Sequence, residues 1–244
     1  MTQAANRIID LRERGAEREG VVEALDRRMF MQLLAFECPD DSPSSSLESL
    51  GAALVQRGGQ AVIYEDLNDP SGIAVLSFSE DPLDFATKLR PAVEGVRGLR
   101  LRREFTMLGR TYSTGFETDL AYWLLRRPLE TVLNPDWPWA IWYPLRRSGA
   151  FERLEPRERG AILREHAEIG KAYGVQGLAH DVRLACHGLD VQDNEFVIGL
   201  VGPKLHPLSH VVQAMRGTRQ TAEFISHMGP FFVGRAVFWN GGCG

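Results

Sequence analysis

The sequence I-A-V-L-S-F-S-E-D-P-L-D-F-A-T-K-L at residues 73–89 has a counterpart in F-V-I-G-L-V-G-P-K-L-H-P-L-S-H-V-V at residues 196–212. Each stretch opens with an apolar run typical of a buried strand. Each then passes through a proline into apolar residues at the spacing of an amphipathic helix. The same strand-to-helix unit therefore occurs once in each half of the chain, which predicts two modules of one kind.

The elements around these two stretches follow the same order in both halves. The first half predicts strands at 28–37, 60–67, 73–79 and 99–109, with helices at 47–58 and 81–93. The second half predicts strands at 139–145, 182–187, 195–201 and 230–239, with helices at 155–173 and 208–219. Both halves thus read β-α-β-β-α-β, which is the ferredoxin-like pattern.

The fold class is therefore α+β, with two tandem ferredoxin-like domains. Each module has an open antiparallel sheet whose free face must be covered. We expect the two sheets to pack together into a dimeric α/β-barrel-like unit. The predicted division is a helical or partly ordered lead-in at 1–27, an N-terminal domain at 28–115, a linker at 116–137 and a C-terminal domain at 138–244.

The charge and hydropathy of the chain exclude some classes of binding partner. The formal net charge of -4 gives no general attraction to nucleic acid or to an anionic membrane. No apolar run reaches the roughly 18 residues that a membrane-spanning helix needs, and the first residues are charged where a signal peptide would be apolar. We expect a cytoplasmic protein whose partners are small molecules or other proteins. The three cysteines, Cys38, Cys186 and Cys243, are too scattered for a disulfide framework.

The six histidines all lie beyond residue 165, which indicates that the two halves have different roles. In the helix predicted at 155–173, His166 shares an apolar stripe with Ile162, Ile169 and Tyr173. A buried imidazole needs a hydrogen-bond partner or a metal ion. A hydrogen-bonded core histidine and a metal ligand both fit this pattern.

The strand predicted at 182–187 carries polar groups on one face. Period-two alternation places Arg183, Ala185 and His187 opposite Val182 and Leu184. The polar face fits either a cavity wall or a solvated sheet surface. The common nucleotide-binding, zinc-protease and serine-hydrolase motifs do not occur in the sequence.

Five ordered motifs resemble those of the chlorite dismutase and coproheme decarboxylase superfamily of heme proteins, over roughly residues 28–239. They are L-G-R-T-Y-S at 108–113, W-Y-P-L-R-R at 142–147, R-E-H-A-E-I-G-K-A-Y at 164–173, G-L-D-V-Q-D-N-E-F-V-I at 188–198 and M-G-P-F-F-V-G at 228–234. The resemblance implies paired ferredoxin-like domains, heme in the C-terminal domain alone, and a homo-oligomer, usually a homopentameric ring.

The resemblance also implies roles for particular residues. His166 matches the proximal histidine that coordinates heme iron. Tyr143 matches the tyrosine that forms a radical and oxidises a propionate in coproheme decarboxylases. Arg147 stands where the family motif has lysine; its planar fork would bind a propionate differently from a point charge. Arg146 and Lys171 are further propionate-binding candidates.

The sequence also departs from the family pattern above and below the expected heme. The distal glutamine of many decarboxylases is missing, which leaves Arg183 as the distal candidate, with His180 or His187 as alternatives. The tryptophans of chlorite dismutases after the lysine position are absent. Gln220 falls near the acidic residue that usually bonds to the proximal histidine; a neutral partner there would make His166 a weaker electron donor.

Three functions remain open. The first is a heme-dependent oxidoreductase that converts coproheme to heme b by peroxide-dependent oxidative decarboxylation. The second is a chlorite dismutase or heme peroxidase in which Arg183 holds a small oxyanion. The third is a non-catalytic carrier or sensor of heme or another tetrapyrrole. Tyr143 and the absent tryptophans favour the first function over the second, and the missing glutamine and Gln220 keep the third open.

Overall fold

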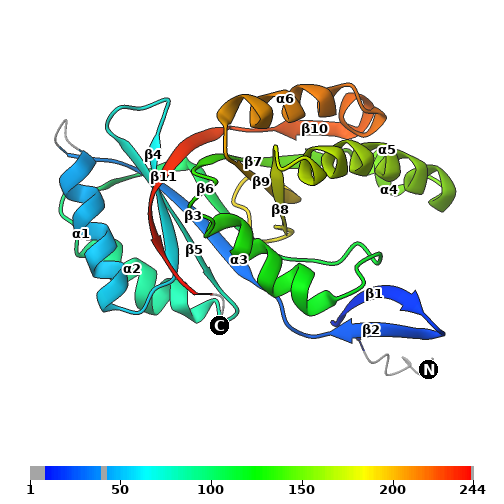
Figure 1. Ribbon diagram of the computed structural model, residues 1–244, viewed down its shortest axis with the longest axis horizontal. Helices are drawn as coiled ribbons and strands as arrows, with labels where there is room; N and C mark the ends of the chain where they lie inside the picture. The colour runs from blue at the N-terminus through cyan, green and yellow to red at the C-terminus, as the bar shows by residue number, and fades with distance from the viewer. Residues whose placement is uncertain (1–8, 40–42, 243–244) are drawn as a thin grey trace, which may run out of the picture.

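The computed structural model describes residues 9–39 and 43–242 (Figure 1). Residues 1–8 of the predicted lead-in and Cys243 lie outside these ranges. The first module runs β3 (Phe30–Glu37), α1 (Pro43–Gln56), β4 (Ala61–Asp66), β5 (Gly72–Ser79), a π-helical segment η1 (Phe85–Leu89) continued by α2 (Arg90–Glu94), and β6 (Arg100–Arg110). Its strands lie in the order β4-β5-β3-β6 and all pair antiparallel, which confirms the ferredoxin-like pattern.

The second module repeats this arrangement. It contains β7 (Trp139–Arg147), α5 (Pro156–Val175), β8 (His180–Ala185), β9 (Phe196–Gly202), α6 (Leu205–Arg216) and β11 (Phe232–Asn240). A short helix α4 (Gly149–Glu152), a π-helical segment η3 (Gln220–Phe224) and strand β10 (Ile225–Met228) complete it. Strands β8, β9, β7 and β11 pair antiparallel in that order, and β10 pairs with the end of β7.

The two sheets join at both edges. Strand β11 pairs with β4 from Gly234 opposite Asp66 to Asn240 opposite Ala61. At the other edge, Arg110 of β6 pairs with Ala185 of β8. The edge strands of each sheet are thus paired with the other sheet, and side chains such as Leu33, Tyr64, Phe78, Trp142 and Phe232 fill the interior of the resulting barrel. The α+β fold with packed antiparallel sheets is therefore confirmed.

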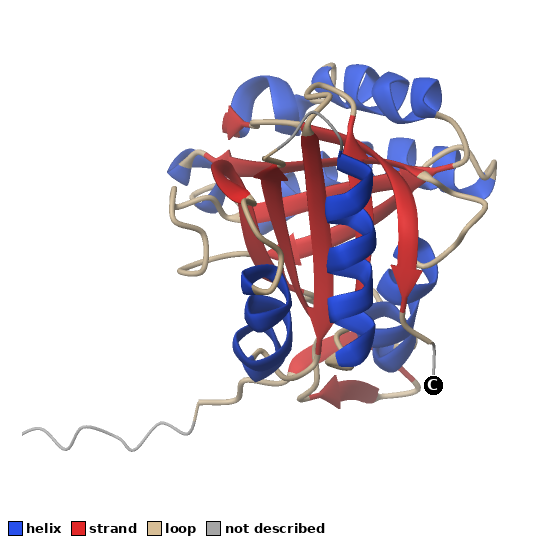
Figure 2. Ribbon diagram, turned by 90° about the vertical axis from the view of Figure 1, so that its left-hand side faces the viewer, coloured by secondary structure: helices blue, strands red, loops and turns tan. Residues whose placement is uncertain are grey.

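Helices cover the outer side of the barrel, but they pack unequally. Figure 2 shows helices against the outer face of the N-terminal sheet. There, α1 buries Ser46, Leu50, Gly51 and Leu54 within 14 residues. On the C-terminal side, α5 buries Ile162 alone within 20 residues. The inward stripe of α5 is thus incompletely packed, unlike that of its counterpart in the first module. Across the described residues, none of the helices has the length and apolar character needed to cross a membrane.

Three features differ from the predicted elements. Residues within the expected helical lead-in form a β-hairpin, β1 (Glu13–Arg18) with β2 (Val21–Leu25), because its backbone groups pair across the turn. The region 116–137 contains a π-helical segment η2 (Tyr122–Arg126) and helix α3 (Arg127–Val132), which packs against β8. Strand β8 ends at Ala185, so His187 lies in the following turn.

Candidate functional site

Three neighbouring strands place Arg183 and Tyr143 on one face of the C-terminal sheet. Arg183 of β8 pairs with Ile198 of β9, which pairs with Tyr143 of β7. Their sequence neighbours Val182 and Trp142 point into the barrel, so Arg183 and Tyr143 point outward toward the helices. Because adjacent strands lie about 4.8 Å apart, the two backbones are roughly 10 Å apart.

His166 faces this sheet from α5 and is half-buried. Its Nδ1 lies 3.4 Å from Oγ1 of Thr218. The Thr218 hydroxyl is 2.8 Å from the carbonyl oxygen of Met215 and donates to it. It therefore accepts from His166, which places the ring proton on Nδ1 and leaves the Nε2 lone pair to bind a metal ion.

The partner of His166 is thus Thr218, and the prediction that Gln220 occupies this position is wrong. Gln220 is buried, and its Oε1 has no hydrogen-bond partner among the described residues. It begins η3, two residues beyond Thr218. The partner that the structure places there, Thr218, is also an uncharged group.

Burial keeps both His166 and Tyr143 neutral. Burial lowers the pKa of His166, and the nearby Arg183 charge lowers it further. A neutral imidazole is the form that binds a metal ion. Burial also raises the pKa of Tyr143, which is 6% exposed and stacks on Phe231 with ring centroids 4.6 Å apart. The Tyr143 hydroxyl therefore keeps its proton at neutral pH.

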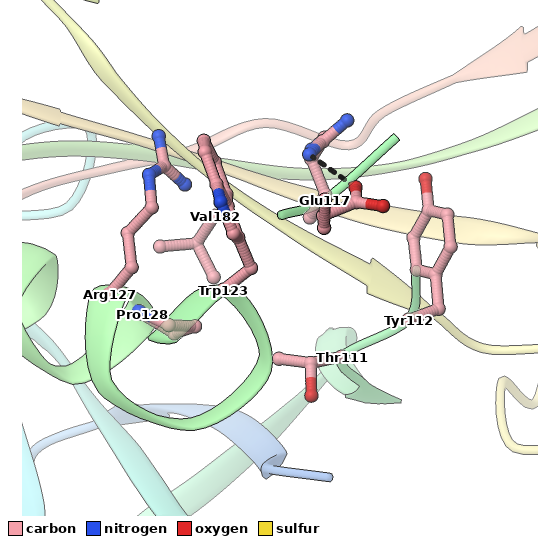
Figure 3. Close-up of a pocket in the computed structure, with 8 residues that line it drawn as sticks. Thr111, Tyr112, Glu117, Trp123, Arg127, Pro128 and Val182 are labelled. Atoms are coloured by element: carbon pink, nitrogen blue, oxygen red, sulfur yellow. Dashed lines mark ion pairs between the residues drawn. The ribbon is translucent and has the colours of Figure 1, made fainter. Parts of the chain in front are cut away.

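Arg183 belongs to a network of ion pairs. Its Nε lies 3.0 Å from Oδ2 of Asp181, and its Nη2 lies 3.8 Å from Oε1 of Glu117. Oδ1 of Asp181 lies 2.7 Å from Nη2 of Arg127, a residue of α3. Figure 3 shows Arg127 and Glu117 on the walls of a cavity of about 10 Å³, which Arg183 and Tyr112 also line. This volume corresponds to about one water molecule.

The predicted propionate-binding residues lie in different surroundings. Arg147 points to the same side as Tyr143, where its guanidinium stacks on Phe151 and Phe196 at 4.5 and 4.6 Å. It also pairs with Glu195 and Glu152. Arg146 lies on the opposite side of β7 and donates from Nη2 to the carbonyl oxygen of Gln192. Lys171 is exposed on α5.

The two alternative distal histidines do not join Arg183. His180 shares the barrel-interior face with Val182 and stacks on Trp137, with ring centroids 3.7 Å apart. His187 is exposed, and its ring meets that of Phe196 in an edge-to-face arrangement. Of the three predicted distal candidates, Arg183 is the one on the sheet face opposite His166.

Three residues of this site received no role from the sequence. Asp181 has the same strand parity as Arg183, so alternation along β8 could have identified it. Tyr112, whose ring lies 5.5 Å from that of Phe196, falls within the motif at 108–113. Thr218 carries no local signal, because its contact with His166 depends on how α5 lies against the segment after α6.

The residues present fit a heme group. The neutral imidazole of His166, whose Nε2 has no partner in the described part of the chain, is the residue that would hold the iron. Half-buried apolar side chains on α5 and β9 could pack on a porphyrin face; they are Ile169, Tyr173, Phe196 and Ile198. Arg147 offers guanidinium N–H groups for a carboxylate. The incomplete packing of α5 is thus consistent with a planar group on this side of the sheet.

Comparison with known proteins identifies relatives of this fold. Residues 127–237 match the chlorite dismutase family. No curated protein matches the chain in sequence. A heme-binding protein from Thermus thermophilus has a similar fold, with a TM-score of 0.67 and 20% identity over 87% of this chain and 92% of that one. A mutant chlorite dismutase from Candidatus Nitrospira defluvii has a TM-score of 0.67 and 16% identity over 87% of this chain and 93% of that one.

A second mutant of the Nitrospira enzyme, in complex with cyanide, gives a TM-score of 0.66 and 19% identity over 87% of this chain and 92% of that one. The matched residues 127–237 contain His166, Tyr143 and Arg183, and the shared fold extends through both modules. The C-terminal half of the chain is therefore similar to the chlorite dismutase family, and both modules share the fold of chlorite dismutase-like proteins.

Proposed function

We propose that this protein is a heme-dependent oxidoreductase that converts coproheme to heme b by peroxide-dependent oxidative decarboxylation. The observation that carries the proposal is the position of Tyr143. It lies buried and protonated on the same sheet face as Arg183, under helix α5, which carries His166. The match of residues 127–237 to the chlorite dismutase family and the heme-binding protein of similar fold support the choice of cofactor.

In this proposal, Nε2 of His166 would hold the iron, and Thr218 would fix the ring by accepting from Nδ1. The bound iron supplies one-electron redox chemistry. Because its phenol is neutral in the buried site, Tyr143 could give up its proton and one electron together, both of them to a heme that hydrogen peroxide has oxidised. Its stacking on Phe231 holds the ring in one orientation.

Arg147 would orient a propionate carboxylate beside Tyr143. Its Nε and one Nη already meet Glu195 and Glu152 at 3.3 and 3.4 Å. The guanidinium has five N–H groups, so donors remain for a further carboxylate. The Arg147 guanidinium stacks on the rings of Phe151 and Phe196, which restricts its orientation. Arg146 and Lys171 would act at the edge of the site.

A second candidate function is the decomposition of chlorite, or a peroxidase activity. In either, the guanidinium of Arg183 would hold a small oxyanion. Its position on the face opposite His166 supports this reading. The carboxylate of Asp181, 3.0 Å from Arg183, opposes it because an anion would meet a like charge. A carrier or sensor role draws its support from the uncharged partner of His166, which leaves the imidazole a weaker donor.

The decisive experiment adds coproheme to the apoprotein, follows the absorption spectrum, then titrates hydrogen peroxide and measures porphyrin mass. We expect the successive loss of two carboxyl groups. Tyr143→Phe should bind coproheme and stop decarboxylation, while Tyr122→Phe on η2 should react normally. His166→Ala should lose the spectrum of histidine-bound iron.

Heme b formation by Tyr143→Phe at the normal rate would refute the role of this tyrosine. Tight binding of coproheme without any mass change in the unmodified protein would refute decarboxylation and favour the chlorite, peroxidase or carrier functions. We also expect a homo-oligomer, and a pentamer by size-exclusion chromatography with light scattering.

A further inference from the structure

We infer that Asp181 determines the ligand charge preference of this site: its carboxylate offsets the charge of Arg183, so that the site selects neutral small ligands over anions. This inference rests on the proposed heme-binding function and deepens it by naming the class of co-substrate. Hydrogen peroxide is such a neutral molecule, and chlorite is an anion.

The contacts of Asp181 fix its carboxylate from two sides. Oδ2 lies 3.0 Å from Nε of Arg183, and Oδ1 lies 2.7 Å from Nη2 of Arg127. Arg127 also donates from Nη1 to the backbone oxygen of Asp181 at 2.8 Å, and its guanidinium stacks on Trp123. Both carboxylate oxygens of Asp181 are therefore held by arginines, one on strand β8 and one on helix α3.

The cluster as a whole carries no excess charge. Two guanidinium groups, from Arg127 and Arg183, face two carboxylates, from Asp181 and Glu117. Glu117 is itself buried and accepts hydrogen bonds from Ser113 and Thr114, which hold it in position. An arginine in such a cluster attracts an anion much less than an isolated arginine does.

Arg183 nevertheless keeps the ability to bind a neutral ligand. Its Nε is engaged by Asp181, but its Nη2 is 3.8 Å from Glu117, which is longer than a hydrogen bond. The side chains of Arg183 and Asp181 are 35% and 39% exposed, so N–H groups remain accessible. A hydroperoxide oxygen could accept from them without bringing a negative charge beside Asp181.

The carboxylate stays charged at neutral pH. Burial alone would raise the pKa of Asp181, but Arg183 and Arg127 outweigh this effect and lower it. The other charged and titratable groups nearby are Glu117, Tyr112, Tyr143, His166 and His180. Burial raises the pKa of Tyr112 and lowers that of His166, so both are neutral. The negative charge opposite Arg183 is therefore permanent under ordinary conditions.

The test measures equilibrium binding of azide, an anion, and imidazole, a neutral ligand, to the ferric heme-loaded protein by absorption titration. Asp181→Asn keeps the shape and a hydrogen-bond acceptor for Arg127. Removal of the negative charge beside Arg183 should strengthen azide binding by roughly tenfold, while imidazole binding stays within about twofold. Arg183→Gln should change azide affinity in the opposite direction, by about tenfold.

Asp69→Asn is the matched control, because Asp69 also pairs with an arginine, Arg102, at 3.0 Å but lies in the N-terminal module. It should leave both affinities unchanged. Equal azide affinity in the unmodified protein and Asp181→Asn would overturn the inference while leaving heme binding intact. Failure of the unmodified protein to take up heme would overturn the proposed function and the inference with it.

Discussion

Thr218→Val tests whether the hydroxyl of Thr218 positions His166. Valine has nearly the same shape, so the change removes the hydrogen bonds and leaves the volume. Thr218 is 1% exposed; its hydroxyl donates to the Met215 carbonyl at 2.8 Å and accepts from His166 Nδ1 at 3.4 Å. The Met215 carbonyl still accepts from the backbone N–H of residue 218 at 3.0 Å, so the loss comes from the His166 and Thr221 N–H groups left without an acceptor, at about 1–3 kcal/mol in total.

The assay has two parts. Urea unfolding of the apoprotein should show that loss in the free energy of unfolding. Heme affinity should also fall by about tenfold to a hundredfold, because a ligand histidine without its partner loses a fixed tautomer and orientation. Thr218→Ser keeps the hydroxyl and should restore heme affinity. If Thr218→Val and Thr218→Ser bound heme equally well, the positioning role of this hydroxyl would be refuted.

Two further predictions concern stability. Gly199→Ala would place a methyl group 2.5 Å from the ring of the fully buried Trp142. Gly199→Ala should lower the free energy of unfolding by about 1–3 kcal/mol. Gly160→Ala on α5 places its new methyl group 3.4 Å from Nη1 of Arg164 and should stabilise the protein by up to about 1 kcal/mol. Equal thermal melting temperatures for the two variants would contradict this prediction. Arg183 and Arg127 outweigh burial and lower the pKa of Asp181 below its ordinary value. The ionised Asp181 carboxylate therefore stabilises the fold fully above about pH 4, and this stabilisation is lost as the pH falls through the lowered pKa. The difference in free energy of unfolding between the unmodified protein and Asp181→Asn should therefore narrow as urea denaturation is repeated from about pH 5 to about pH 2.5, and a constant difference would count against the ion pairs.

Local periodicity predicted the barrel strands and the long helices. These patterns depend on residues only a few positions apart, as in the alternation around Trp142 or the apolar stripe through Ile162 and His166. The apolar side of each pattern then shows which face of the strand or helix is buried. The β1–β2 hairpin was missed because charged residues alternate with aliphatic ones there without a clear strand pattern.

The sequence by itself determined the repeated module, the α+β class and the helix face that carries His166. Tertiary structure alone decided that Thr218 bonds to His166 in place of Gln220, and that Asp181 lies between Arg127 and Arg183. Thr218 is 52 positions from His166, and Arg127 is 54 from Asp181. Hydrogen-bond and ion-pair partners depend on where separate elements cross, and backbone periodicity carries no information about that crossing.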